Sequence, residues 1–377
     1  MKLIDKIKQG GKKFEPVKWL SSFAAKRKGQ NILATYKEVW IGLGLLMIVV
    51  LVIVFSLSST VDKVSPAVQN VTDILGITDE LPRHPLTGVA IDEEYKTLPQ
   101  VFGIMVENSA DAWPLSGIDD AFLVIEAPVE ANIPRFIVFF SDEDATAKVG
   151  PVRSARSYYL DWNDEFDAVY AHVGGSPEAL ELIRDKFETI DFNQFWHGEY
   201  FYRSTARYAP HNVYTTIENL TSALEELDLK KPEYGTWLFK NDEPVENNGK
   251  SLSVNFADGT TYDLDWRYNQ KTNDYTRYQG TSIMRLDYGD TVEVNNVAVI
   301  ATDIKIIDNE GRKSIVTVGE GDALLAQDGK VIVCRWRKEE RTERLRFFDI
   351  DGEEIKMNAG KTWIEVVSSL SQVTTHE

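Results

Sequence analysis

The longest stretch of apolar side chains lies near the N-terminus and contains no charged residue. It runs from Val39 to Leu57 and shows no polar face. About 20 apolar residues, at about 1.5 Å rise each, cover the roughly 30 Å hydrocarbon core of a bilayer, so the pattern predicts a single transmembrane helix at residues 39–58. A cleaved signal peptide is the alternative, with Ser56 and Ser58 as its cleavage site, although such a peptide usually has an apolar core of only about 7–15 residues.

Between residues 85 and 230, short apolar runs alternate with helical patterns. Runs typical of buried strands are Val101–Val106, Ala121–Ile125, Phe136–Phe140 and Ala168–His172. Ser176 followed by Pro177 has the signature of an N-cap and a first helical residue, which predicts a helix to about Lys186. A second helix is expected over 211–227, where apolar residues recur on one face. This mixture predicts a mixed α/β domain.

After Pro232 the pattern changes to short alternating segments separated by turn signals such as Glu310–Gly311 and Asp328–Gly329. Turns at roughly ten-residue spacing are typical of a β-rich domain. The expected fold class is therefore α+β, with a single N-terminal transmembrane helix, then a mixed α/β domain at 85–230 and a smaller β-rich domain at 231–377.

Charge is distributed unevenly around the apolar run. Residues 1–38 contain ten Lys/Arg and three Asp/Glu, a net charge of +7, and because the whole chain carries −18 the remainder carries −25. The positive-inside rule then predicts a basic cytoplasmic tail at 1–38, one span of the cell membrane, an extracellular stalk at 59–84 and C-terminal domains outside the cell. A domain this acidic repels phosphate backbones, so nucleic acid is not expected as a partner.

Cys334 is the only cysteine of the chain, so no internal disulfide is expected. It lies in an apolar run, where a buried packing role is typical of a free cysteine. No cysteine follows the apolar segment closely, so a lipid-accepting cysteine is absent there.

The first candidate for chemistry is the turn between the predicted strand at 168–172 and the next helix. Gly174 and Gly175 let a ligand approach the backbone, and the open amides at the helix start near Ser176 favour an anion. His172, at the strand end, is a candidate for ligand binding or acid–base catalysis. The alternative is an ordinary capped helix after a tight turn. The segment is neither a P-loop nor a G-x-S-x-G nucleophile elbow.

Four arginines in two compact clusters form the second candidate. The ligand-binding candidates in these clusters are Arg153, Arg156, Arg203, Arg207, His211 and Asn212. Arginine recognises carboxylate or phosphate in a planar, bidentate way, so an anionic ligand is expected. The alternative is that each arginine pairs with one of the many acidic residues of the domain.

The carboxylates Glu107, Glu126 and Glu130 are the third candidate. Glu107, followed by Asn108, ends one apolar strand, and Glu126 ends another and is a second candidate acid–base residue. Structural ion pairs with the arginines are the alternative. Metal binding by His172 or His211 with these carboxylates lacks a recognised ligand spacing, so neither a metal nor another cofactor is predicted.

Several polar segments form a longer pattern. They are PLTG at 85–88, EN at 107–108, PLSG at 114–117, EAPVE at 126–130, VGPVRSAR at 149–156, AHVGGS at 171–176, RYAPHN at 207–212, DGK at 328–330 and GKTW at 360–363. Together they resemble the YerB-like lipoproteins of Gram-positive envelopes, a two-part domain of unknown function. The resemblance implies an envelope-anchored, two-domain protein and supplies no established reaction. The chain departs from the lipoprotein pattern by lacking the lipid-accepting cysteine, which the predicted helix at 39–57 replaces.

The leading hypothesis is a membrane-anchored extracellular module that binds an anionic ligand, either a cell-wall fragment or a phosphorylated envelope molecule. The rival is an envelope hydrolase acting on phosphoesters or cell-wall material, with His172 or Glu126 as the acid–base group and arginines stabilising developing charge. A non-catalytic scaffold for envelope proteins is the third hypothesis.

Overall fold

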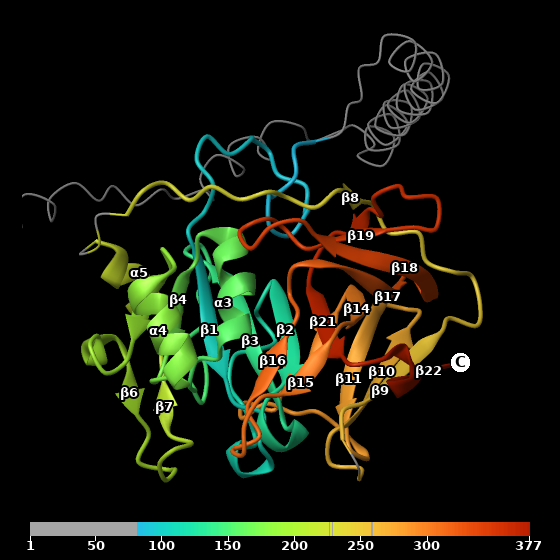
Figure 1. The fold of residues 1–377 in the computed structure, drawn as a ribbon. Coiled ribbons are helices and arrows are strands. Elements are labelled where there is room, and N and C mark those ends of the chain that lie inside the picture. Colours follow the sequence, from blue (N-terminus) through green and yellow to red (C-terminus); the bar gives the residue numbers. More distant parts are fainter. Residues whose placement is uncertain (1–80, 226, 228, 258) are drawn as a thin grey trace, which may run out of the picture. The chain divides into compact units, whose positions relative to one another are not determined.

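A ten-stranded sheet organises the part of the chain that the computed structural model describes, residues 81–377 without 226, 228 and 258 (Figure 1). Its strands lie in the order β19, β18, β17, β14, β21, β2, β3, β1, β4 and β5. In that order their bounds are Arg346–Phe348, Lys330–Lys338, Gly319–Gln327, Asn296–Ala301, Thr362–Val367, Leu123–Pro128, Pro134–Ser141, Val101–Val106, Val169–His172 and Ile190–Asn193. Strands from both halves of the described sequence therefore share one sheet.

The two halves meet where β21 lies between β14 and β2. β21 pairs in parallel with β14 on one side and in parallel with β2 on the other. Its register places Val124 opposite Trp363 and Glu126 opposite Glu365. Every residue of β2 and β21 is buried, so the junction lies in the interior.

A second, six-stranded sheet and three two-stranded pairs complete the described strands. The second sheet contains β12 (Ser282–Ile283), β11 (Asp274–Gln279), β10 (Asp263–Asn269), β9 (Ser251–Asn255) and β22 (Val373–His376), with β13 (Glu293–Val294) beside β11. The pairs are β15 (Ile304–Ile306) with β16 (Lys313–Ile315), β20 (Met357–Asn358) with β8 (Phe239–Lys240), and β6 (Tyr202–Arg203) with β7 (Val213–Tyr214).

The described α-helices are short. α3 (Ser157–Asn163), α4 (Pro177–Asp185) and α5 (Ile217–Leu224) contain seven, nine and eight residues. Single 3₁₀ turns occur at Ala110–Ala112, Glu130–Asn132, Asp164–Phe166, Gly198–Tyr200 and Leu370–Gln372. α4 begins as predicted, because the Ser176 side chain accepts a hydrogen bond from the amide of Ala179 and Pro177 is the first helical residue.

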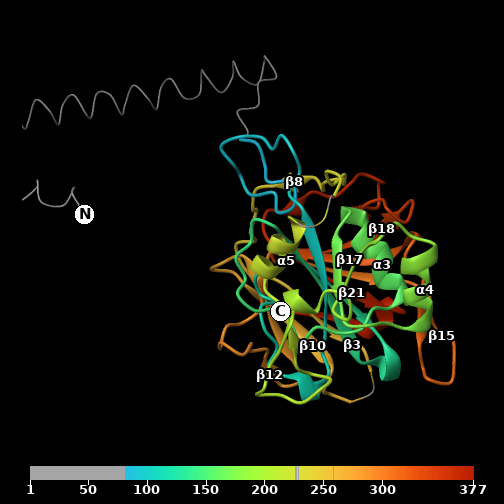
Figure 2. The ribbon, with the colours of Figure 1, turned by 90° about the vertical axis from the view of Figure 1, so that its left-hand side faces the viewer.

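The large sheet is covered on both faces, as the view in Figure 2 shows with α3 and α4 on one side and the second sheet and α5 on the other. Side chains alternate along β1 between the two cores. Phe102 and Ile104 pack with residues of the second sheet and α5, whereas Val101 and Met105 pack with residues of α3 and α4. Because both faces of the strand are buried, apolar residues are favoured at successive positions, which explains the sequence VFGIMV.

The predicted strands are confirmed with small shifts of their ends, as β1, β2, β3 and β4. The helix expected over 211–227 is shorter than predicted, because residues 213–214 form β7 and only Ile217–Leu224 is helical. Val213 pairs with Arg203 in a hairpin, and this pairing with a residue outside the segment overrides its helical pattern.

The predicted fold class is wrong. An α+β chain with a mixed α/β domain and a separate β-rich domain was expected, yet strands dominate the described residues and one sheet crosses both regions. No helix among the described residues is long and apolar enough to cross a membrane. The segments predicted as tail, transmembrane helix and most of the stalk, residues 1–80, lie outside the described residues. The boundary proposed near residue 230 stays a prediction.

Candidate functional site

Glu126 and Glu365 lie side by side in the interior where β2 and β21 pair. Arg277 of β11 donates two hydrogen bonds to the Glu126 carboxylate, at 3.0 and 2.8 Å, and all three side chains are fully buried. One arginine therefore faces two carboxyl groups. Burial and the adjacent Glu126 raise the pKa of Glu365 well above its ordinary value, which favours the protonated form of Glu365.

Neutral donors complete this buried network. The indole nitrogens of Trp363 and Trp266 donate to Glu126 at 3.1 Å and to Glu365 at 2.8 Å. The amide of Asn108, which is also fully buried, donates to Glu126 at 3.1 Å. The network joins the large sheet to β10 and β11 of the second sheet. Glu126, a candidate acid–base residue, is thus enclosed by protein donors and has no exposed surface.

His172, the other candidate acid–base residue, ends β4 and is also fully buried. Its Nδ1 lies 2.7 Å from the carbonyl oxygen of Gly174, and its Nε2 lies 2.7 Å from a carboxylate oxygen of Asp191 in β5. Both ring nitrogens are therefore occupied within the protein. In this arrangement the ring fixes the turn after β4 and offers no nitrogen to a ligand.

The glycine turn is closely packed. Gly174 has a φ of +60°, which favours glycine, and its amide donates to the Asn193 side chain at 3.1 Å. A Cβ at Gly175 would lie 3.1 Å from a methyl carbon of Leu180 and 3.2 Å from the Cβ of Ala155. The positive φ accounts for Gly174 and the close contacts with Leu180 and Ala155 account for Gly175, while Ser176 uses its hydroxyl to cap α4.

Glu107, Arg153 and His211 come together at the end of β1. Arg153 forms an ion pair with Glu107, whose carboxylate also lies 3.4 Å from Nδ1 of His211. Arg153 donates in addition to the carbonyl of Pro210, at 3.2 Å. Burial lowers the pKa of Arg153, with Glu107 acting against this shift and the charge of Arg135 acting with it. The group holds the loop after β6 against β1.

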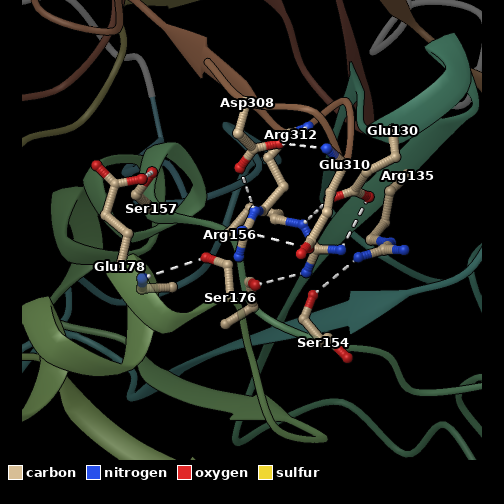
Figure 3. Close-up of polar contacts among 12 residues, drawn as sticks. Glu130, Arg135, Ser154, Arg156, Ser157, Ser176, Glu178, Asp308, Glu310 and Arg312 are labelled. Carbon is tan, nitrogen blue, oxygen red and sulfur yellow. Dashed lines mark hydrogen bonds and ion pairs between the residues drawn. The ribbon is translucent and has the colours of Figure 1, made fainter. Parts of the chain in front are cut away.

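Arg156 forms the most regular ion pair of the candidate set, with Glu130 (Figure 3). Its Nε and Nη2 donate to the two oxygens of Glu130, each at 2.8 Å. Burial acts against both charges, but the paired hydrogen bonds raise the pKa of Arg156 and lower that of Glu130. Beside this pair, Arg312 bonds to Asp308, and Arg135 donates to the carbonyl of Ser154 at 3.1 Å (Figure 3).

Arg203 and Arg207, which lie on and beside the β6–β7 hairpin, have a different kind of partner. Exposed Arg203 donates to the amide oxygens of Asn212 and Gln194, at 3.1 and 3.2 Å. Half-buried Arg207 donates to the backbone carbonyls of Ala112 and Pro114, at 2.5 and 2.7 Å. Within the described residues, no carboxylate forms an ion pair with either guanidinium. Both arginines are therefore oriented by neutral oxygens, and their charges stay uncompensated.

The structure thus separates the candidate residues into groups instead of one pocket. His172 with the glycine turn, Glu107 with Arg153 and His211, Arg156 with Glu130, and the hairpin arginines each have their own partners. In the described residues, no three His, Cys, Asp or Glu side chains are placed to hold a metal ion.

Sequence reasoning missed Arg277, Glu365 and Arg135. Each is a charged residue inside a strand rich in apolar or aromatic residues, in DYTRYQ, TWIEVV and PRFIVFFS. A charge within such a run is a signal, because a buried charge requires a partner. The identity of that partner depends on strand pairing, which the sequence does not reveal.

Residues 86–230 match the N-terminal domain, and residues 252–364 the C-terminal domain, of a protein family described as of unknown function, DUF3048. The chain belongs to this family. It is 31% identical over 295 residues to "Putative lipoprotein YerB" of Bacillus subtilis (strain 168), covering 76% of this chain and 86% of that relative. The crystal structure of YerB protein from Bacillus subtilis matches with a TM-score of 0.70 and 29% identity, covering 78% of this chain and 100% of that one. The resemblance to YerB-like proteins is confirmed.

The buried network lies between the two DUF3048 segments. Asn108 and Glu126 come from the N-terminal segment, and Arg277 and Trp363 come from the C-terminal one. The two parts of the family sequence are therefore joined in this chain by an interior ion pair as well as by the shared sheet.

Proposed function

We propose that this DUF3048 protein is attached to the outer face of the cell membrane and binds an anionic cell-wall-related ligand through Arg203 and Arg207. The observation that carries the proposal is the contrast between the two arginine clusters. Arg153 and Arg156 are neutralised by Glu107 and Glu130, whereas the two hairpin arginines are held by amide and carbonyl oxygens alone within the described residues.

When an anion binds, the two kinds of arginine lose different partners. A guanidinium that already pairs with a carboxylate must give up that pair to hold a ligand. Arg203 has only neutral partners, so a phosphate or carboxylate would add a charge-assisted hydrogen bond without displacing an ionic one. Because the rest of the chain is strongly acidic, such a local cationic surface favours anions where most of the molecule repels them.

Groups suited to a polymeric ligand surround these arginines. Tyr202 and Tyr208 are 40% and 93% exposed, and the amides of Gln194 and Asn212 lie against Arg203.

Arg203→Gln is expected to weaken binding to purified Gram-positive cell walls by roughly tenfold, since a hydrogen bond to a charged group contributes about 1.5–3 kcal/mol. Co-sedimentation with intact walls, and with walls stripped of phosphate polymers by acid, measures the effect. Binding should fall as salt is raised, because exposed charges are screened.

Arg184→Gln is the matched control for Arg203→Gln. Arg184 is an exposed arginine of α4 that pairs with Asp185 at 2.6 Å, so its removal should leave wall binding unchanged. Equal binding by wild type and Arg203→Gln, or binding that does not depend on salt, would contradict the proposal.

Attachment to the membrane is tested separately. We expect the full chain to sediment with membranes after a high-salt wash and the segment Leu81–Glu377 to remain in the supernatant. This expectation rests on the apolar sequence before residue 81 and on the relative's name as a lipoprotein. Protease added to intact protoplasts should digest the full chain. Protection from that protease would place the domain inside the cell and refute this part of the proposal.

A further inference from the structure

A cavity of about 560 Å³ lies between the loop that follows β1 and the turn that joins β11 to β12. Trp113 and Pro114 line it from the loop, and Thr281 and Ile283 line it from the β11–β12 hairpin. Ligand pockets usually have volumes of about 300–1,000 Å³, with mostly apolar walls and a few placed polar groups. None of the residues assigned above to anion binding lines this cavity.

The indole of Trp113 is held in place before any ligand arrives. Its Nε1 donates to the side-chain oxygen of Asn108 at 3.0 Å, and its ring meets that of Tyr262 edge-on, with centroids 6.2 Å apart. Arg207 donates to the carbonyls of Ala112 and Pro114, the residues on either side of Trp113. A side chain fixed in this way loses little conformational entropy on binding.

The inner end of the cavity is equally fixed. Gln279 lines it and is only 8% exposed. Its side-chain oxygen accepts from Arg277 at 2.5 Å, and its amide nitrogen lies 3.4 Å from the side-chain oxygen of Asn108. The side chains of Trp113 and Gln279 thus both contact the side chain of Asn108, which in turn donates to Glu126. The buried ionic network therefore fixes the position of two residues that line the cavity.

The outer rim of the cavity consists of hydroxyl groups. Thr260, Thr261, Thr281 and Ser282 line it, are exposed, and form no side-chain hydrogen bond in the part of the chain that is described. No Asp or Glu lies among the lining residues, and the one lining cation, Arg285, donates to the carbonyl of Gly289 at 3.0 Å. Apolar surface from Ile283 and Met284 completes the wall.

We propose that this cavity binds a neutral N-acetylated sugar unit of a glycan. A pyranose ring has an apolar face of C–H groups that can stack on an indole, which matches Trp113, and hydroxyls that can exchange hydrogen bonds with the threonine and serine rim. An acetamido group adds a methyl for the apolar wall and an amide for polar neighbours such as Gln279. No carboxylate lines the cavity, so a cationic ligand would find no partner of opposite charge there.

The N-acetylglucosamine tetramer is the probe, and its binding to the full chain in detergent is followed by saturation-transfer NMR and titration calorimetry. Thr281→Trp places a bulky ring in the cavity from an exposed turn and is expected to weaken binding at least tenfold. Thr272→Trp is the matched control, since Thr272 is an exposed threonine in the neighbouring β10–β11 turn and does not line the cavity. It should bind like the wild type.

Trp113→Ala provides a second variant and should lose the tetramer signal while circular dichroism shows the fold retained. Arg203→Gln should bind the tetramer like the wild type, so failure of this inference and failure of the anion-binding proposal are distinguishable. The inference is overturned if the wild type does not bind the tetramer or if Thr281→Trp binds it unchanged. It is also overturned if an apolar peptide, and not the sugar, binds in a manner that Thr281→Trp abolishes.

Discussion

Replacing Arg277 with methionine is expected to lower the free energy of unfolding by about 3–5 kcal/mol at pH 7, because removal of one partner of a buried ion pair leaves the other charge unpaired. Glu126 would keep its hydrogen bonds from Asn108 and Trp363 but lose the only cation that it contacts in the described structure. Urea unfolding of the segment Leu81–Glu377, followed by circular dichroism, measures the loss.

Glu365→Gln is the matched change on the other side of the same network. Glu365 holds its proton in the folded state because burial and Glu126 raise its pKa, so a neutral glutamine reproduces its charge. It can still accept from the Trp266 indole. We expect this variant to stay within about 1 kcal/mol of wild type at pH 5, since the replacement is nearly isosteric and both forms are neutral.

The pH dependence of the free energy of unfolding follows from the direction in which the pKa of Glu365 is shifted. Above the ordinary carboxyl pKa the unfolded chain releases this proton while the folded chain keeps it, so wild-type stability falls as pH rises through this window. Glu365→Gln removes that slope and should therefore become the more stable protein toward pH 8. An equal loss in Arg277→Met and Glu365→Gln at pH 7 would mean that Glu365 is ionised, and would refute this account.

Glu165→Gln is expected to have a comparable effect, about 3–5 kcal/mol, at a second buried ionic group. Glu165 accepts hydrogen bonds from Lys338 at 3.0 Å, from Arg344 at 2.6 Å and from the amide of Leu345 at 3.1 Å. All three ionic side chains are 5% exposed or less. One anion therefore serves two buried cations, and its removal leaves both uncompensated. The same urea unfolding experiment measures the change.

The protonation of Lys338 determines how the stability lost in Glu165→Gln depends on pH. Burial lowers the pKa of Lys338, and the charge of Glu165 acts against this shift. Between that lowered value and the ordinary pKa of a lysine, the unfolded state binds more protons than the folded state, so stability rises with pH. Without Glu165 the pKa should fall further, and the deficit of Glu165→Gln should therefore shrink from pH 7 to pH 9.

The double variant Glu165→Gln/Lys338→Met tests this mechanism. Methionine removes the unpaired cation, so the double variant should be more stable than Glu165→Gln alone. Its loss of stability should therefore be smaller than the sum of the two single losses. Lys338→Met alone should cost less than Glu165→Gln, because Glu165 keeps Arg344. If the double variant loses the sum of the two single losses, the ionic account of this site is wrong.

Both buried groups join regions that are far apart in the sequence. Glu126 and Glu165 come from the segment before residue 230, whereas Arg277, Lys338 and Arg344 come after it. Loss of either group should therefore weaken the whole described unit in one transition. The cavity beside Trp113 rests on Asn108 and Gln279, so Arg277→Met should also disturb it.

Local sequence patterns were sufficient for features whose cause lies within a few residues. The strand Val101–Val106 is apolar throughout because it is buried on both faces, and the Ser176–Pro177 start of α4 depends only on adjacent backbone groups. The polar motifs also indicated the family. The same patterns failed at residues 213–214, where a helical spacing of apolar side chains belongs to a hairpin strand.

Tertiary structure decided which charges meet, and hence the character of every candidate site. The residue types of Arg156 and Arg203 are identical, yet one has a carboxylate partner and the other has two amides, because the fold places different turns and loops beside them. Glu126 ends an apolar run, as an active-site residue often does, but β21 places a second carboxyl group beside it and β11 places an arginine over it. Sequence by itself determined the family, many of the local elements and the residues capable of chemistry. The strand pairing over more than two hundred residues, which sets distance, burial and charge, is a property of the folded chain alone.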